Sequence, residues 1–393
     1  MAIERVYLDY NATAPVLPAA REAAVHALGI MGNPSSVHAE GRAARQIVDH
    51  ARTQVAALLK VSVDRVTFTS GGTEAAVLAL QPEATGAGNL LLVAAGEHPC
   101  VLEGHGFSQD RARVVPLDAD GRICLEALGA ALDAAGERGV TLALQAANNE
   151  TGVVQPVAEA SAMVRKGGGK QVGGKIVCDA VQVAGRLDCL TACAGADLVV
   201  LSGHKMGGIK GVGALVSLSG LLEPAAAVLR GGGQEKGLRA GTENVPAIAA
   251  FGAAAQWALE NQNIEARRLE KLRNAFEMQL ASRFPDAVIF GQNSPRLANT
   301  SAFAIPGVSA ETLLIALDLA GLSVSSGSAC SSGKVKSSHV LEAMGVEPQI
   351  ARGAMRVSLG HRSQGSDMEK LLAGLDKSVA RINSRTSAIQ TAA

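Results

Sequence analysis

The chain has 393 residues, of which 48% are hydrophobic and 18% are charged, and its 36 basic and 36 acidic residues cancel to a formal charge of zero. This length exceeds the roughly 250–300 residues at which one hydrophobic core stops growing, so we expect two domains, or one large domain with an appended smaller one. A neutral chain has no electrostatic reason to bind nucleic acid or an anionic membrane. We therefore expect the partner to be a small molecule or another protein.

The sequence favours a cytoplasmic location. Glu4 and Arg5 stand where a secretory signal needs an uninterrupted apolar segment. The longest weakly polar run, residues 211–229, is interrupted by Glu223 and Pro224, so it makes a poor membrane span. The six cysteines form no metal-type CxxC pair, so we expect reduced thiols and no metal site.

Short β-branched or leucine-rich segments alternate along the chain with alanine-rich segments. Apolar residues recur at helical spacing over residues 42–59 and 158–165. This alternation is typical of an α/β fold with a mostly parallel sheet covered by helices. The predicted strands are residues 66–69, 90–93, 141–144, 175–178, 197–201 and 213–216.

The pattern changes in the last third of the chain. A long helical signal runs through Trp257 to Arg283, and shorter strands and helices mix after it. We place the domain boundary near residue 255, with a large domain over residues 14–255 and a smaller α+β domain made of residues 1–13 and 256–393. The glycine-rich and lysine-rich residues 166–175 are predicted to be a flexible surface insertion.

Ligands of open α/β sheets bind at the carboxyl ends of strands, so the residues that follow each predicted strand are candidates for the site. Residues 70–74, Ser-Gly-Gly-Thr-Glu, come between a strand and a helix. Such a turn presents free backbone N–H groups and a hydroxyl to an anion such as phosphate. The alternative is a helix capping box, with Ser70 or Thr73 as the cap.

Three more reactive side chains follow strands. Lys205, in Ser202-Gly-His-Lys, stands among small residues where lost solvation lowers a lysine pKa, as a Schiff-base amine requires. Asp179 could pair with a pyridinium nitrogen, and the imidazole of His98 could stack on a planar ring. Taken singly, each residue has a structural alternative: Lys205 could be a surface lysine, Asp179 a helix cap and His98 a structural histidine. Together with the phosphate-type turn they predict a pyridoxal phosphate site.

Nearly the whole chain resembles the cysteine desulfurases, class V aminotransferases of the fold type I pyridoxal phosphate enzymes. Any one matching segment is weak, but their joint occurrence in the family's order is specific. The matching segments are residues 8–13, 32–38, 70–74, 97–99, 148–156, 179–182, 202–205, 239–244 and 325–330.

The resemblance implies a role for each matching residue and an aspartate aminotransferase-like large domain. Lys205 would bond pyridoxal 5′-phosphate covalently, Asp179 would pair with its ring nitrogen, and His98 would stack on the ring. Asn33 and Arg356 would hold the substrate carboxylate. Asn149 and Gln182 would contact the ring oxygen, and the phosphate would be bound by Gly72, Thr73, Ser202, His204 and, from the other subunit of a homodimer, Thr242.

Cys330 separates desulfurases from the rest of the family. It lies among serines and glycines, in a segment that resembles a mobile loop. The resemblance implies that this thiol takes sulfur from L-cysteine as a persulfide, releases L-alanine, and passes the sulfur to an acceptor protein such as an iron–sulfur scaffold, or towards thiolated cofactors or tRNA. The alternatives are a selenocysteine lyase or another class V enzyme, and a non-catalytic scaffold.

Overall fold

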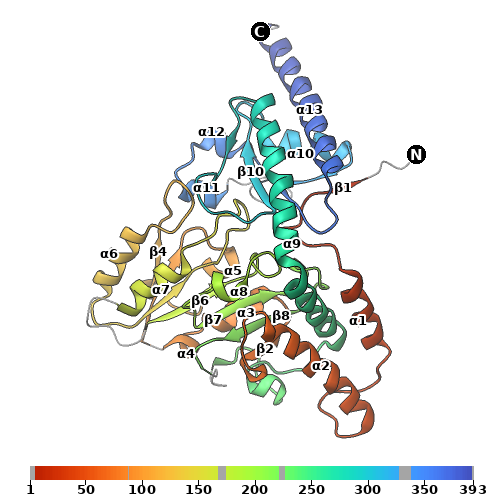
Figure 1. Cartoon of the computed structure of the whole chain (residues 1–393). Coiled ribbons are helices and arrows are strands. Elements are labelled where there is room, and N and C mark those ends of the chain that lie inside the picture. Colours follow the sequence, from red (N-terminus) through yellow and green to blue (C-terminus); the bar gives the residue numbers. More distant parts are fainter. Residues whose placement is uncertain (1–4, 87, 167–173, 221–225, 327–337, 392–393) are drawn as a thin grey trace.

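The computed structural model describes residues 5–86, 88–166, 174–220, 226–326 and 338–391. A seven-stranded sheet lies in the lower half of Figure 1, and a four-stranded sheet lies above it. Most of the predicted insertion and the whole of residues 327–337, with Cys330, fall outside the described residues. In the part of the chain that is described, no helix is both long and apolar enough to cross a membrane.

The large sheet is mostly parallel, as predicted. β3 pairs in parallel with β4 and β5, β5 with β6, and β6 with β7, whereas β8 runs antiparallel to both β7 and β2. In spatial order the strands are β2 (Val66–Thr69), β8 (Gly213–Ser217), β7 (Leu198–Ser202), β6 (Lys175–Asp179), β5 (Val140–Ala143), β3 (Leu90–Ala94) and β4 (Ala112–Val115).

Continuous apolar runs form these strands because helices cover both faces of the sheet. In β3, Leu90 and Leu92 belong to one buried cluster, and Leu91 and Val93 belong to another. The first cluster includes residues of α1 (Pro18–Leu28), α2 (Ala39–Ala57), α6 (Leu125–Ala135), α7 (Val157–Lys166) and α9 (Val245–Arg283); the second includes residues of α3 (Gly72–Ala79) and α5 (Pro99–Leu102).

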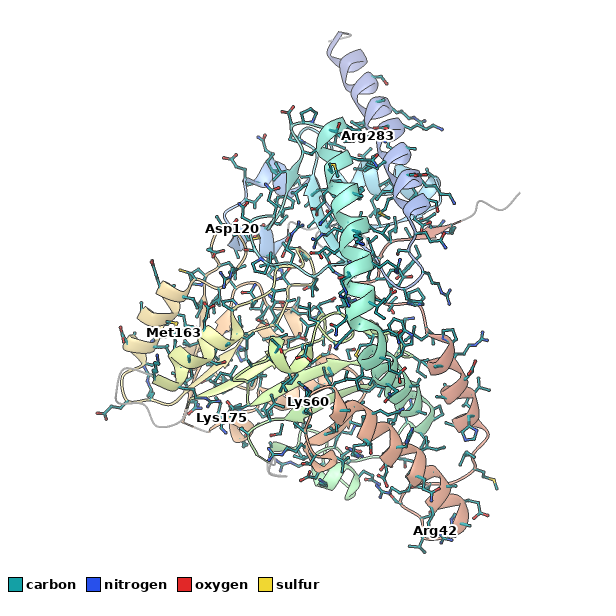
Figure 2. All side chains as sticks on the ribbon, in the orientation of Figure 1. Arg42, Lys60, Asp120, Met163, Lys175 and Arg283 are labelled. Atoms are coloured by element: carbon teal, nitrogen blue, oxygen red, sulfur yellow. The ribbon has the colours of Figure 1, made fainter. Side chains whose placement is uncertain are left out.

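The helix α9 connects the two sheets. The side chain of Asn244 caps its start by accepting the N–H of Ala247 at 3.2 Å. Its alanine-rich first half packs closely on α2, where a Cβ on Gly252 would lie 2.6 Å from the Cα of Ala51. Figure 2 shows Arg283, at the far end of α9, at the opposite end of the molecule from Arg42.

The four-stranded antiparallel sheet carries a second core. Its strands, in spatial order, are β12 (Ser325–Ser326), β13 (Ala354–Ser358), β10 (Thr300–Ala304) and β9 (Val288–Ile289). Around it lie α10 (Ala310–Leu319), α11 (His339–Ala343), α12 (Pro348–Ala351) and α13 (Gly365–Thr391), and the short helices α4 (Pro82–Thr85) and α8 (Cys189–Ala192) belong to the lower half.

The N-terminal segment joins this second part of the chain. β1 (Val6–Tyr7) pairs in parallel with β11 (Leu322–Ser323). The first core cluster includes residues of α9 up to Ala258, and the second includes Leu269, Phe276 and Leu280. This partition of buried residues supports our proposal of a large domain over residues 14–255 and a small one made of residues 1–13 and 256–393.

Candidate active site

The carboxyl ends of two neighbouring strands bring the predicted reactive residues together. β6 ends at Asp179, β7 ends at Ser202, and the 3₁₀ turn η4 (Gly203–Lys205) follows directly. The Lys205 Nζ donates to the backbone carbonyls of Asn11 at 2.6 Å and Ala12 at 2.8 Å. The N-terminal segment therefore contacts the lysine at this edge of the sheet.

The surroundings of Lys205 raise the fraction of its side chain that is free amine. Burial, together with the guanidinium groups of Arg186 and Arg356, lowers the pKa of Lys205 to about 8, although Asp179 and Asp9 act in the opposite direction. A lysine with this pKa has far more nucleophilic amine near neutral pH than a surface lysine. The interpretation of Lys205 as an ordinary surface lysine is therefore wrong.

Two carboxyl groups, those of the half-buried Asp179 and the buried Glu97, lie close enough to interact with each other beside Lys205. The Asp179 Oδ1 accepts the N–H of Val181 at 2.8 Å, and burial raises the pKa of Asp179 to about 6. Glu97 is 1% exposed, its Oε1 accepts the N–H of Gln145 at 2.5 Å, and its Oε2 has no partner among the described residues. Burial and the charge of Asp179 raise the pKa of Glu97 well above its ordinary value.

His98 caps a helix and also exposes its imidazole ring at the site. Its Nδ1 accepts the N–H of Cys100 at 3.2 Å at the start of α5, which leaves the proton of the neutral ring on Nε2. The imidazole remains exposed at the site. Burial of part of the ring, Lys205 and His339 lower the pKa of His98, so the ring stays neutral.

The start of α3 forms an anion cradle. Its N-cap, Gly71, supplies no capping side chain, and a Cβ on Gly72 would lie 3.3 Å from the Cβ of Ser202. The Ser202 hydroxyl thus lies beside free backbone N–H groups of α3. One of the two hydrogen bonds of the alternative capping box is present, because a Glu74 carboxylate oxygen accepts the N–H of Ser70 at 2.9 Å. No side chain of a described residue caps the start of α3.

Two further predicted phosphate ligands are Thr73, in the first turn of α3, and His204, in the turn after β7. Thr73 is exposed and its hydroxyl interacts with the Cys100 thiol. The His204 Nδ1 lies 3.1 Å from the Thr13 Oγ1. Burial and the Lys205 charge lower the pKa of His204 to about 4, so it offers a neutral N–H group.

Arg356 offers an unused donor to a carboxylate. It lies on β13 and is 4% exposed, and its Nη2 pairs with the Asp9 Oδ1 at 2.7 Å. The Nη1 donates to the Asn149 carbonyl at 3.0 Å, and the buried Nε has no partner among the described residues. The Asn149 side chain belongs to the same turn, so the two predicted residues are neighbours.

Asn33 and Thr242 stand apart from this cluster. Asn33 lies in the exposed loop between α1 and α2, where its side chain accepts the N–H of Ser35 at 2.8 Å. Thr242 is exposed just before α9. In the described residues, no hydrogen bond joins either side chain to Lys205, so both assignments remain predictions.

The sequence interpretation missed Arg186. Its Nη1 donates to the Gln182 Oε1 at 2.9 Å, and the Gln182 Nε2 donates to the Asn11 carbonyl at 3.1 Å. Its position four residues after Gln182 could have indicated that the two side chains lie close together. Asp9 and Glu97 lay inside matching segments, but no role was assigned to them.

These features fit pyridoxal 5′-phosphate. The α3 cradle with Ser202 and His204 suits a phosphate, and the exposed His98 ring suits a planar ring. Buried carboxyl groups are costly without a cation, and a protonated pyridine nitrogen would supply one beside Asp179. The Lys205 amine lies close enough to interact with Asp179.

Comparisons with known proteins agree with this site. The family model for aminotransferase class-V matches residues 6–371. A cysteine desulfurase of Cereibacter sphaeroides is 38% identical over 378 residues, with 94% of each chain covered. The X-ray structure of a NifS-like protein from Rickettsia africae superposes with a TM-score of 0.86 at 32% identity, covering 96% of this chain and 100% of that one.

A second similar structure contains a ligand. The structure of SspA in complex with cysteine is 26% identical, with a TM-score of 0.72 over 90% of this chain and 98% of that one. Family match, identity over nearly the full length and fold all agree. The chain therefore belongs to the aminotransferase class-V family, and within it to the cysteine desulfurases, which are enzymes dependent on pyridoxal 5′-phosphate.

Proposed function

We propose that this site binds pyridoxal 5′-phosphate and converts L-cysteine to L-alanine, with Cys330 accepting the sulfur as a persulfide. The observation that carries the proposal is the juxtaposition of Lys205, with its pKa lowered to about 8, and the half-buried Asp179 at the end of the neighbouring strand. A reactive amine beside such a carboxylate is the pair that this cofactor requires.

The described residues divide into those that hold the cofactor and those that hold the substrate. Gly72, Thr73, Ser202 and His204 bind the phosphate, and Asp179 and His98 hold the ring. Asn149 and Gln182 contact the ring oxygen. Arg356 binds the substrate carboxylate through its unused Nε, with Asn33 assisting and Thr242 reaching the phosphate from a second subunit.

When bound, pyridoxal 5′-phosphate supplies an electron sink for the electron pair left by loss of the substrate Cα proton. The Lys205 amine accepts that proton, and its lowered pKa suits proton exchange near neutral pH. The thiolate of Cys330 attacks the substrate sulfur, and the bond from sulfur to Cβ breaks with its electron pair left on carbon. One proton then completes the methyl group, and Lys205 returns a proton to the Cα to give alanine. Arg356 keeps the substrate carboxylate fixed throughout.

Three of the described cysteines, Cys100, Cys178 and Cys189, are poor candidates for the sulfur acceptor. Burial raises the pKa of Cys100 to about 12, and the pKa values of Cys178 and Cys189 lie well above the ordinary value. Such thiols are poor nucleophiles. Cys330 lies outside the described residues, so its role rests on the family resemblance and on this contrast.

We propose L-cysteine as substrate because of the similarity to SspA, whose structure contains cysteine. The working unit is a homodimer, and the persulfide passes to an acceptor protein such as an iron–sulfur scaffold. Free reactive thiols persist in a reducing compartment, which supports a cytoplasmic location.

Product analysis tests the proposal. The purified enzyme should release alanine and, with a reducing thiol, sulfide in equal amounts from L-cysteine. A keto acid without sulfide would indicate an aminotransferase, and a much higher rate with L-selenocysteine would indicate a selenocysteine lyase. A colourless protein that does not take up the cofactor would contradict the proposal and favour a non-catalytic scaffold.

A further inference from the structure

The guanidinium group of Arg186 connects three separate parts of the active site. Its Nη1 donates to the backbone carbonyl of Gln182 at 2.7 Å and to the Gln182 Oε1 at 2.9 Å. Its Nη2 donates to the carbonyl of Tyr10 at 3.2 Å and, at 3.4 Å, to that of Lys205. One side chain thus contacts the N-terminal segment, the turn after β6 and the turn after β7.

All four of these acceptors are uncharged. Among the described residues, Arg186 forms no ion pair with a carboxylate. Burial and the charge of Arg356 lower the pKa of Arg186 to about 10, so it still carries its charge at neutral pH. Arg186 is half-buried, and a cation that loses part of its hydration without gaining a counter-ion is costly, so such a group is expected to have a function that offsets the cost.

The contacts of Arg186 fix the orientation of the Gln182 amide. An amide presents an acceptor oxygen and a donor NH₂ group, which exchange places when it flips. Because Arg186 only donates, it holds the Oε1 towards itself and turns the Nε2 to the Asn11 carbonyl, 3.1 Å away. The same Asn11 carbonyl accepts from the Lys205 Nζ at 2.6 Å. If the amide flipped, the Gln182 Oε1 would face the Asn11 carbonyl oxygen, and two acceptors cannot form a hydrogen bond.

We propose that Arg186 is a positioning residue of the active site, which orients the Gln182 amide as a donor towards the cofactor and acts electrostatically on the Lys205 amine. One N–H of Gln182 Nε2 is used by Asn11, and the other remains free for the ring oxygen of the cofactor. This inference rests on the proposed function, because it assigns Gln182 and Lys205 to the cofactor.

Arg186 is one of several charged or titratable groups around the Lys205 amine. Burial is the largest cause of the lowered pKa of Lys205, and the charge of Arg186 is the next largest. The groups that face Lys205 from the surrounding elements are Arg186, Arg356, Asp179, Asp9, His98 and His204. Loss of the Arg186 charge should raise the pKa of Lys205, since it removes a repulsion of the ammonium form.

The first experiment measures how the rate of pyridoxal 5′-phosphate uptake by the apoprotein depends on pH. Uptake requires the free amine, so its midpoint reports the pKa of Lys205. We expect Arg186→Met to move the midpoint upward by about one pH unit and to slow uptake at pH 7 about tenfold. Arg186→Lys keeps the charge and should leave the midpoint unchanged. Arg113→Met, at an exposed position of β4, controls for loss of one positive charge.

The second experiment tests the orienting role through cofactor affinity. Dissociation constants for pyridoxal 5′-phosphate would be measured for Arg186→Lys, Gln182→Ala and the double variant. If Arg186 acts through Gln182, the double variant should bind no more weakly than the weaker single variant. Additive losses would overturn the orienting role, and this cycle remains decisive if Arg186→Met does not fold.

The two proposals fail in different ways. Wild-type protein that takes up no pyridoxal 5′-phosphate would contradict the proposed function itself. Wild-type protein that binds the cofactor, with Arg186→Met folded and its uptake midpoint unchanged, would overturn only the electrostatic role of Arg186.

Discussion

The half-buried carboxyl group of Asp179 destabilises the apoprotein. Its pKa lies near 6 in the folded chain, against 3.8 for an unperturbed aspartate, so the folded state binds more protons than the unfolded state between these values. Stability therefore falls as the pH rises from about 4 to about 6. Above that window the cost amounts to as much as about 3 kcal/mol.

Replacing Asp179 by asparagine should therefore stabilise the apoprotein while weakening the holoenzyme. The amide keeps the acceptor for Val181 and removes the charge, so the unfolding temperature of the apoprotein at pH 8 should rise by several degrees. The gain should nearly disappear at pH 3, where the carboxyl group is mainly protonated in both states. Calorimetry at the two pH values checks this, and equal gains at both would show that charge is not the cause.

Lys205 should be the residue that bonds the cofactor. Replacing it with alanine removes the amine that donates to the carbonyls of Asn11 and Ala12, so turnover should fall to background. Borohydride treatment of the cofactor-loaded wild type should attach the cofactor permanently to the peptide containing Lys205. If Lys205→Ala still gives a borohydride-fixed adduct, another lysine has this role.

Cys330 should be needed for sulfur transfer but not for cofactor binding. Cys330→Ser keeps the size of the side chain and supplies a hydroxyl that is far less acidic than a thiol. The variant should bind pyridoxal 5′-phosphate normally and release no sulfide from L-cysteine. Mass spectrometry of the wild type after brief exposure to L-cysteine should place the extra sulfur on the Cys330 peptide. Sulfur found only on Cys100, in spite of its raised pKa, would reverse the assignment.

At the scale of elements, the phosphate cradle depends on close contact between β8 and the start of α3. A Cβ on Gly213 would lie 2.5 Å from the backbone carbon of Gly71 and 2.7 Å from the carbonyl oxygen of Leu201. The backbones of Gly71 and Leu201 lie on two sides of this Cβ, so they cannot both move away from it. Gly213→Ala should therefore cost about 1–3 kcal/mol of stability and loosen cofactor binding.

Gly71 provides the matched control. A Cβ there would meet no atom within 4 Å, and its φ of 166° is extended backbone that any residue adopts. In denaturant unfolding of the apoproteins, Gly71→Ala should stay near the wild type while Gly213→Ala falls below it. Equal stability of the two variants would show that β8 and the turn can move apart freely.

The elements differed in how well the sequence predicted them. The core strands were predictable because burial on both faces requires continuous apolar runs, as in β3 and β7. The edge strand β4 was missed, since Arg113 and Val114 are both exposed and give no such run. Arg186 was missed for another reason: its role depends on contacts with Tyr10 and Lys205, which are distant in sequence.

At the scale of the whole molecule, the N-terminal segment connects both sheets to the site. The Asn11 N–H donates to the Ser358 Oγ in the small sheet at 2.9 Å, and the Asn11 carbonyl accepts from Lys205 beside the large sheet. Asp9 pairs with Arg356 on β13. The site therefore depends on how the two parts of the chain are packed, which no single motif specifies.

The exposure of Thr242 has a consequence for the assembly. Its neighbour in role, Ser202, is 3% exposed at the cradle, whereas Thr242 is exposed. If Thr242 binds the phosphate as proposed, its exposed position fits a homodimer in which it completes the site of the other subunit. Sedimentation of the holoenzyme should give twice the chain mass of 40.0 kDa.

Mixing two impaired variants tests whether Thr242 acts across the interface. Lys205→Ala and Thr242→Ala homodimers each have the same defect in both sites. In a mixed dimer, an intersubunit Thr242 places both defects in one site and leaves the other intact, so activity at limiting cofactor should recover after the subunits are mixed and exchanged. If Thr242 serves its own chain, each mixed site keeps one defect and no recovery beyond that of the Thr242→Ala subunits follows. Recovery would therefore establish at once the dimer, the shared site and the place of Thr242 in it.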